Sequence, residues 1–264
     1  MAAEHKDNIT PFNLYNDVNV EGASNVCEVA RQKKIKTIIF TSSVAVYGFA
    51  EINTSEAGKI NPFNEYGRTK FEAEKIYTQW QEEEPNKRTL VIIRPTVVFG
   101  EKNRGNVYNF LKQVASKYFL MVGKGGNRKS MAYVENVAAF IEYSLKFKPG
   151  IHIYNYIDKP DFTMSELVLY VRKILGKSQK VNFHLPYSFG LLIGKLFDLA
   201  SLITRKKFAI SSIRVKKFCA NSFYSSAVEK TGFIPPVSLC DAIKKTIRFE
   251  FLEDHKSDIV FYSE

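Results

Sequence analysis

The feature that most constrains the fold is an alternation between short runs of β-branched residues and longer segments with helical periodicity. Residues 37–42 (TIIFTS), 89–94 (TLVIIR) and 151–156 (IHIYNY) predict strands. The apolar spacing over residues 19–31 and 66–83 predicts helices that flank the first strand. Apolar strands separated by helices are typical of a parallel sheet buried on both faces. The sequence therefore predicts an α/β fold with right-handed crossover connections.

After Gly100 the periodicity is mostly helical. This half is predicted to form a smaller, mostly helical lobe that is interwoven with the last strands of the sheet. The expected helices cover residues 106–117, 134–146, 164–175, 187–204 and 239–252.

The most apolar stretch of the chain runs over residues 188–204, where Lys195 and Asp198 interrupt it. A membrane-spanning helix needs about 20 mostly apolar residues. We therefore expect no spanning segment, and the stretch predicts an amphipathic helix that covers a core. Residues 205–207 (RKK) follow it directly, which leaves contact with a membrane surface open as an alternative.

Charge and cysteine content narrow the classes of partner and compartment. The formal net charge is +11, which favours anionic partners such as nucleotides, sugar phosphates, nucleic acid or acidic lipid. Three scattered cysteines and four histidines without metal-ligand spacing predict no disulfide framework and no metal site, and suit a reducing cytoplasm. The N-terminal residues lack the apolar core of a signal peptide. No nucleic-acid partner is expected, because no recognisable module contains the basic residues Lys206, Lys207, Arg214, Lys216 and Lys217.

The segment that carries chemistry is Tyr66-Gly-Arg-Thr-Lys70. Residues four apart lie on one face of a helix, so the Tyr66 hydroxyl and the Lys70 ammonium can serve one site. A phenol has a pKa near 10, and a nearby cation lowers that pKa toward the range of useful acid–base catalysis. The end of the preceding strand, Thr41-Ser42-Ser43, can supply a second hydroxyl, because parallel sheets place ligands at the carboxyl ends of their strands.

With its surroundings, this motif resembles the extended short-chain dehydrogenase/reductases, in the branch of NAD-dependent epimerases and dehydratases that act on nucleotide sugars. The resemblance implies a partial Rossmann-like parallel sheet with a mostly helical C-terminal lobe. Residues 1–100 would be the C-terminal part of the NAD-binding domain, and residues 101–264 the substrate-binding lobe. Members commonly dimerise through the tyrosine helix, so a homodimer is a further expectation. The matching segments are Asn19-Val20-x-Gly22, Phe40-Thr-Ser-Ser43 with Val46-Tyr-Gly48, Asn64-x-Tyr66-Gly-x-x-Lys70, Arg94-Pro95 with Val98-x-Gly100, and Tyr133-Val134-x-Asn136-Val137-Ala138.

The resemblance also implies roles for individual residues. Tyr66 would be the acid/base, Lys70 would bind the nicotinamide ribose and lower the pKa of Tyr66, and Ser43 would orient the reacting hydroxyl. The cofactor would further contact Asn19, Ser42, Pro95 and Val98.

On the substrate side, the resemblance places Asn106 at the diphosphate of a nucleotide sugar, together with Lys129 or Arg128. Those two basic residues follow a glycine-rich run that begins at Gly123 and superficially suggests a Walker A loop. Arg128 stands where that loop requires a glycine before Lys-Ser. The run therefore predicts a basic turn beside the substrate phosphates.

The triplet Ser43-Val44-Ala45 bears on the reaction. Sugar 4,6-dehydratases of this family carry an Asp-Glu pair after the hydroxyl residue, and valine and alanine cannot transfer protons. Epimerisation or one-way reduction of a keto sugar with NAD or NADP remains. The alternatives are a hydroxysteroid-type dehydrogenase, whose pocket the apolar helix 189–203 would line, and a catalytically inactive binding protein of the same fold.

The chain contains no Gly-x-Gly-x-x-Gly or Gly-x-x-Gly-x-x-Gly motif, with which the family opens its cofactor domain. We therefore expect a truncated chain, rather than a naturally shortened fold, that lacks about two βαβ units with the pyrophosphate loop. The predicted consequence is weak NAD binding by the 264-residue chain, measured by titration calorimetry. A dissociation constant in the micromolar range would contradict this expectation.

Overall fold

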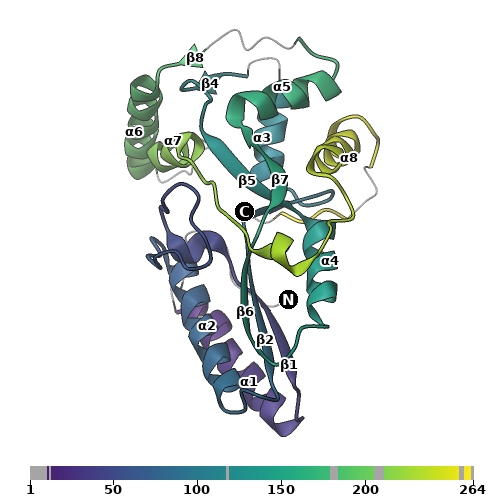
Figure 1. Cartoon of the computed structure of the whole chain (residues 1–264). Helices are drawn as coiled ribbons and strands as arrows, with labels where there is room; N and C mark the ends of the chain where they lie inside the picture. Colours follow the sequence, from purple (N-terminus) through teal and green to yellow (C-terminus); the bar gives the residue numbers. More distant parts are fainter. Residues whose placement is uncertain are drawn as a thin grey trace.

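The computed structural model describes residues 11, 13–116, 119–178, 184–204, 211–255 and 259–262. Its first layer is a three-stranded parallel sheet in the order β1-β2-β6, as Figure 1 shows. The strands are β1 (Thr37–Thr41), β2 (Thr89–Pro95) and β6 (Gly150–Tyr156). One face of the sheet packs on α1 (Gly22–Gln32) and α2 (Glu65–Glu82), and a short π-helix, Asn16–Glu21, precedes α1.

The burial of the central strand β2 explains why its sequence is a continuous apolar run. Every residue of β2 is buried. Leu90 and Ile92 pack with Ala73 and Trp80 against α1 and α2. Val91 and Ile93 alternate with them and pack, with Phe140 of α4 (Val134–Ser144), on the opposite face. A strand that buries both faces needs apolar residues at each position. The predicted α/β fold with a parallel sheet is confirmed.

The rest of the chain builds a second layer above the sheet (Figure 1). Strand β5 (Arg128–Tyr133) pairs in parallel with β3 (Val97–Phe99) and antiparallel with β7 (Asp158–Thr163). A core that includes Phe99, Leu111, Val168 and Ile243 joins this sheet to three helices. These helices are α3 (Asn106–Ala115), α5 (Met164–Ile174) and α8 (Leu239–Phe251). The division into a cofactor domain and a substrate lobe stays a prediction.

Smaller elements complete the described chain. The two-stranded pair β4 (Met121–Val122) and β8 (His184–Leu185) precedes α6 (Tyr187–Thr204), which packs against α7 (Ser212–Cys219). The 3-10 helices are η2 (Val44–Tyr47) and η3 (Val228–Thr231).

Two sequence predictions are wrong. Arg128, Lys129 and Ser130 were expected in a turn, but they begin β5, and Lys129 pairs with Phe162 of β7. The interpretation fails because β5 and β7 are stabilised by pairing between distant segments rather than by local apolar alternation. The structure also contains β3, β7 and α7, which the periodicity did not indicate.

The second wrong prediction concerns α6, which was expected to cover a core with its apolar side. Large apolar side chains of α6 face away from the protein: Leu192, Leu196 and Leu199 are each more than half exposed. The helix contacts its neighbours through glycines instead. A Cβ on Gly194 would lie 2.7 Å from the Ser212 Cα, and a Cβ on Gly190 would lie 2.7 Å from a Val122 methyl. By length and composition alone, α6 is also apolar enough to cross a membrane.

The close approach of α2 to η2 gives a test of the fold around the tyrosine helix. A Cβ on Gly67 would lie 2.4 Å from the Ala45 carbonyl oxygen, whereas nothing lies within 4 Å of a Cβ on Gly126. Gly67→Ala should therefore lower the free energy of unfolding by about 1–3 kcal/mol, measured by urea denaturation. Gly126→Ala is the matched control and should leave the midpoint nearly unchanged; equal midpoints for both variants would contradict the packing described.

Candidate active site

The first turn of α2 places the two residues of the sequence motif. Asn64 caps the helix, and its side chain accepts a hydrogen bond from the Gly67 backbone N–H at 3.0 Å. Tyr66 and Lys70 then lie one turn apart on the side of α2 that faces β1. The Lys70 Nζ donates to the Thr41 carbonyl oxygen at 3.0 Å and lies 5.9 Å from the centre of the Tyr66 ring. The structure thus brings tyrosine, lysine and the strand end together.

Two serines at the carboxyl end of β1 complete this cluster. The Ser43 hydroxyl lies beside the Tyr66 hydroxyl and accepts a hydrogen bond from the Ala45 backbone N–H at 3.1 Å. This bond to Ala45 caps the 3-10 helix η2 and fixes the rotamer of Ser43. The Ser42 side chain points the other way, into the protein, where it donates to the Glu74 Oε1 at 2.5 Å. Ser43 therefore lies beside the Tyr66 hydroxyl, whereas the Ser42 hydroxyl is bonded inside the protein and stabilises the end of β1.

Burial dominates the protonation of both motif residues. It lowers the pKa of Lys70 to about 8, and the negative charge of Glu74 works against that shift. Burial raises the pKa of Tyr66, and the neighbouring Ser43 hydroxyl works against that shift. Lys70 is not among the groups that shift the pKa of Tyr66 in this structure, so the expected lowering by Lys70 does not appear here. Tyr66 is therefore protonated at neutral pH and is a hydrogen-bond donor there.

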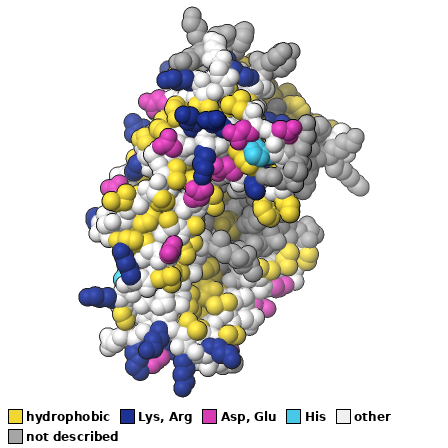
Figure 2. Space-filling view, turned by 90° about the vertical axis from the view of Figure 1, so that its right-hand side faces the viewer, with side chains coloured by type: hydrophobic (Ala, Val, Ile, Leu, Met, Phe, Trp, Pro, Cys, Tyr) yellow, Lys and Arg dark blue, Asp and Glu magenta, His cyan; other side chains and the backbone are white. Residues whose placement is uncertain are grey.

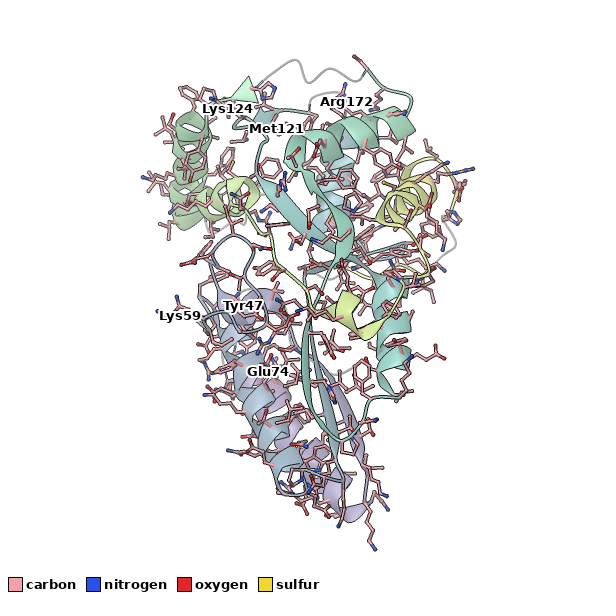
Figure 3. All side chains as sticks on the ribbon, viewed as in Figure 1. Tyr47, Lys59, Glu74, Met121, Lys124 and Arg172 are labelled. Atoms are coloured by element: carbon pink, nitrogen blue, oxygen red, sulfur yellow. The ribbon has the colours of Figure 1, made fainter. Side chains whose placement is uncertain are left out.

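Beneath these residues lies a buried ion pair that the sequence analysis missed. Arg94 of β2 forms two hydrogen bonds to Glu74 of α2, at 2.9 Å and 2.5 Å, and both side chains are 4% exposed. Arg94 also donates to the Tyr47 hydroxyl at 2.7 Å, and Tyr47 donates to the Asn155 Oδ1 at 2.8 Å. Figure 3 shows Glu74 and Tyr47 following one another between α2 and the sheet. The position of Glu74, one helical turn after Lys70, was the signal that could have revealed it.

The residues predicted to contact a cofactor lie on three elements around α2 and β2. Asn19 is buried in the π-helix, and its Nδ2 donates to the Thr69 hydroxyl at 3.0 Å, directly beside Lys70. Pro95 is the buried last residue of β2, and Val98 is half-buried in β3. Asn19 therefore adjoins the tyrosine helix, Pro95 directly follows Arg94 within β2, and Val98 lies in the next strand.

The residues predicted to bind the substrate lie in the second layer. Asn106 is exposed at the first position of α3. Arg128 is exposed at the start of β5, and the neighbouring Lys129 donates to the Ser222 hydroxyl at 3.2 Å. Burial lowers the pKa of Lys129 to about 8. A hollow of about 530 Å³ ends at Asn127, the residue before Arg128, and its wall is formed by Phe49, residues 122–127, Tyr187, Lys216, Cys219 and Ala220.

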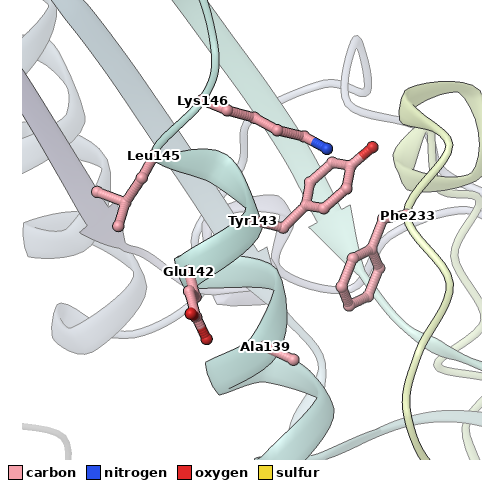
Figure 4. A pocket seen from close by; sticks show the side chains of 6 residues that line it. All are labelled: Ala139, Glu142, Tyr143, Leu145, Lys146 and Phe233. Atoms are coloured by element: carbon pink, nitrogen blue, oxygen red, sulfur yellow. The ribbon is translucent and has the colours of Figure 1, made fainter.

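A second hollow of about 550 Å³ lies on the outside of α4 and contains none of the predicted site residues. Figure 4 shows Lys146 extended over the Tyr143 ring, with Phe233 beside it. The Lys146 Nζ is 3.4 Å from the centre of that ring, and the Tyr143 hydroxyl donates to the Thr231 carbonyl oxygen at 2.5 Å. These contacts tie α4 to the segment around η3 and have no connection to the tyrosine and serine hydroxyls.

With this geometry established, comparison with known proteins defines the class. Residues 2–156 match the model of the NAD dependent epimerase/dehydratase family. The chain belongs to this family. The predicted family is confirmed, and with it the class of NAD-dependent epimerase-type enzymes.

Two relatives and one solved structure show which members of the family this chain resembles. The chain is 50% identical, over its whole length and 80% of the relative's, to the N-acetyl-alpha-D-glucosaminyl-diphospho-ditrans,octacis-undecaprenol 4-epimerase of Escherichia coli O157:H7. It is 30% identical, over 90% of its length and 72% of the relative's, to the sterol-4-alpha-carboxylate 3-dehydrogenase of Candida albicans. The crystal structure of the UDP-glucuronic acid 4-epimerase of Bacillus cereus in complex with NAD superposes with a TM-score of 0.69. At 18% identity, that match covers 94% of this chain and 72% of the other and supports the fold alone.

The buried ion pair gives a prediction for the stability of the site. Glu74→Gln leaves Arg94 as a buried charge without its carboxylate and should cost about 3 kcal/mol or more in the free energy of unfolding. Glu72→Gln on the same helix breaks the exposed pair with Lys75 and should cost no more than about 1 kcal/mol. Chemical denaturation measures both, and similar losses for the two variants would refute the structural role given to Glu74.

Proposed function

We propose that this protein is a 4-epimerase that acts on an N-acetylhexosamine joined through a diphosphate to a polyprenyl lipid. The observation that carries the proposal is the 50% identity, along the entire chain, to an enzyme with that substrate in its name. The cluster of Ser43, Tyr66 and Lys70 supplies the groups that reversible oxidation at a sugar carbon requires. The predicted nucleotide-sugar substrate is thereby refined, because a polyprenyl chain takes the place of the nucleoside beyond the diphosphate.

The hydroxyl groups of Tyr66 and Ser43 act at the C4 oxygen of the sugar. Tyr66 holds or moves the proton at that oxygen, and Ser43 orients the oxygen by a hydrogen bond. Lys70 contributes a positive charge one helical turn away, which stabilises negative charge that develops on the phenol. Val44 and Ala45 offer no further acid or base beside these residues, so the site does not support elimination of water.

The residues present fit the nicotinamide end of NAD. The residue Lys70 is 5% exposed. Its ammonium carries three protons, and within the described part of the chain one of them is bonded to the Thr41 carbonyl oxygen. The remaining protons suit ribose hydroxyls. Asn19, Pro95 and Val98 are the further cofactor contacts, whereas the Ser42 hydroxyl is bonded to Glu74 and supports the site from within. When bound, NAD supplies reversible hydride transfer at the sugar carbon and a positive charge near the phenol.

The proposed contacts with cofactor and substrate divide between the two halves of the chain. Residues 1–100 position the reactive end of the cofactor, and residues 101–264 hold the sugar and diphosphate, with Asn106, Arg128 and Lys129 as the phosphate contacts. Lys129 is a point charge without a bidentate fork, so Arg128 takes the larger share. A homodimer through α2 and a cytoplasmic location stay predictions; size-exclusion chromatography with light scattering tests the first.

Substrate conversion tests the proposal directly. The purified chain, with a large excess of NAD, is incubated with detergent-solubilised N-acetylglucosaminyl-diphospho-undecaprenol, with UDP-N-acetylglucosamine and with a 3-hydroxysteroid. We expect the C4 epimer from the lipid-linked sugar, without net consumption of NAD. If only the UDP-sugar were converted, the proposal of a lipid-linked substrate would be wrong, and a nucleotide sugar would be the substrate. If only the steroid were oxidised, the protein would be a dehydrogenase like the Candida relative.

Removal of the Tyr66 hydroxyl tests its role in proton transfer. Tyr66→Phe should lower the turnover number by roughly 10²–10⁴ while leaving the Michaelis constant for the sugar similar. A variant with near-normal turnover would show that another group moves the proton.

Loss of the Lys70 charge should appear in the pH profile. Since the pKa of Lys70 is lowered to about 8, the ammonium is present below that pH and is lost as the pH rises through it. Turnover should therefore fall on the alkaline side of about pH 8, and Lys70→Met should lower it at every pH. Lys75→Met, on the exposed side of the same helix, is the control and should keep both the rate and the alkaline limb. An unchanged limb in Lys70→Met would exclude Lys70 as its origin.

A further inference from the structure

The outer face of α6 is apolar along its full length. Phe189, Leu192, Leu196, Leu199 and Ile203 follow one another at intervals of three or four residues, and their exposed fractions range from 52% to 75%. These intervals place all five on one side of the helix. On the opposite side, Gly190 and Gly194 are buried against β4 and α7. The orientation is the reverse of an ordinary surface helix, which turns its large apolar side chains inward.

The position of α6 leaves this face open to the surroundings. In Figure 1, α6 is the outermost helix on its side of the second layer, with α7 between it and the rest of the protein. Figure 2 shows a different face, where apolar side chains are interspersed with charges of both signs. A contiguous apolar patch of the kind seen on α6 marks an interaction surface, whereas scattered apolar residues do not.

The charges around this face have one dominant sign. Residues 187–219 contain seven Lys and Arg side chains and one acidic residue, Asp198. Asp198 is turned toward α7, where it accepts a hydrogen bond from the Ser212 backbone N–H at 3.2 Å. Lys195 on α6 and Arg214 and Lys216 on α7 are exposed. Arg205, Lys206 and Lys207 lie outside the described residues. An apolar helix face with basic surroundings complements an anionic lipid surface.

The hollow of about 530 Å³ described above lies between this side of the protein and the segment that contains Phe49. Tyr187, the first residue of α6, and Lys216 of α7 form one side of it. Phe49 forms another, and it lies on the segment that leads from Ser43 to the tyrosine helix. The hollow thus opens beside α6 and α7, with Lys124 and Lys216 in its wall, and extends as far as Phe49.

We propose that α6 lies flat in the interface of an anionic bilayer and holds the protein there, so that a membrane-embedded lipid presents its diphosphate-linked sugar to the site. The glycine contacts to α7 and the bond of Asp198 keep α6 parallel to the protein surface, which an interfacial helix requires and a spanning helix does not. Lys195 lies at the edge of the apolar face, where its long stem extends to the phosphate layer. The role in substrate access rests on the proposed function, whereas the contact with lipid does not.

Vesicle binding tests the contact with lipid by itself. The protein is floated with phosphatidylcholine vesicles that contain or lack phosphatidylglycerol. We expect binding to the anionic vesicles that weakens at high salt. The double variant Leu196→Glu/Leu199→Glu should bind about tenfold less or weaker still, because it loses two apolar side chains from the lipid. Val26→Glu/Val29→Glu, at residues of similar exposure on α1, is the matched control and should bind like the wild type.

Light scattering of the same variants separates a bilayer from a second copy of the chain. Wild-type protein that fails to bind vesicles, or α6 variants that bind as well as the control, would overturn the proposal. So would a wild-type dimer that becomes monomeric in the α6 double variant, because a second chain would then cover the face. Circular dichroism and thermal unfolding confirm that the variants are folded, which these exposed positions favour.

Turnover separates this proposal from the proposed function. The substrate is supplied embedded in vesicles and as a water-soluble analogue with a short prenyl chain. The α6 double variant should lose conversion of the embedded substrate and keep conversion of the soluble one. Equal conversion of both substrates by the variant would overturn the role of α6 in access. A wild-type protein that binds vesicles but converts neither substrate would refute the proposed function and leave the lipid contact standing.

Discussion

The buried pair of Glu74 and Arg94 is the interaction on which the geometry of the site depends. It joins the middle of α2 to the end of β2, so the tyrosine helix and the strand ends keep a fixed distance. Through Tyr47 the same pair reaches Asn155 in β6, and Asn155 in turn is held by Thr54 and Ser225. A buried pair of this kind adds little net stability but makes other arrangements costly, because either charge alone would be buried without compensation.

The same ion pair also sets the electrostatics of the cluster of Ser43, Tyr66 and Lys70. Glu74 lies one turn beyond Lys70, and its negative charge keeps the buried ammonium protonated to a higher pH than burial alone would allow. Without a further positive charge, burial keeps Tyr66 protonated. The Tyr66 phenol is thus a hydrogen-bond donor in this structure, and a positive charge placed beside it would lower its pKa. An enzyme that must both remove and return a proton at the same oxygen benefits from a group poised in this way.

The sequence predicted those parts of the site that depend on local spacing. Tyr66 and Lys70 share a face because they are four residues apart, and the strand ending in Ser42 and Ser43 is a compact apolar run. The spacing places Glu74 on the same face of the helix as Lys70, but its partner Arg94 lies 20 residues away on another element, so the pair itself could be recognised only in the folded chain. For the same reason Arg128 and Lys129 were assigned to a turn: their strand exists because β3 and β7 lie beside it. Periodicity also identified α6 as a helix, but it could not tell which neighbours the helix would have.

The inner face of α6 carries glycines instead of large apolar side chains, and this explains why its outer face is exposed. Gly190 and Gly194 allow close contact with α7 but bury little apolar surface, so the contact itself cannot compensate for leucines left in water. The polyprenyl diphosphate proposed as substrate poses a matching problem, because its lipid would stay in the bilayer while its sugar would have to reach Ser43 and Tyr66. Placing the leucines in the interface solves both problems at once: the apolar face leaves water, and the basic side chains lie at the level of the phosphates. The same reasoning explains why a sugar epimerase fold would carry so apolar a helix on its outside.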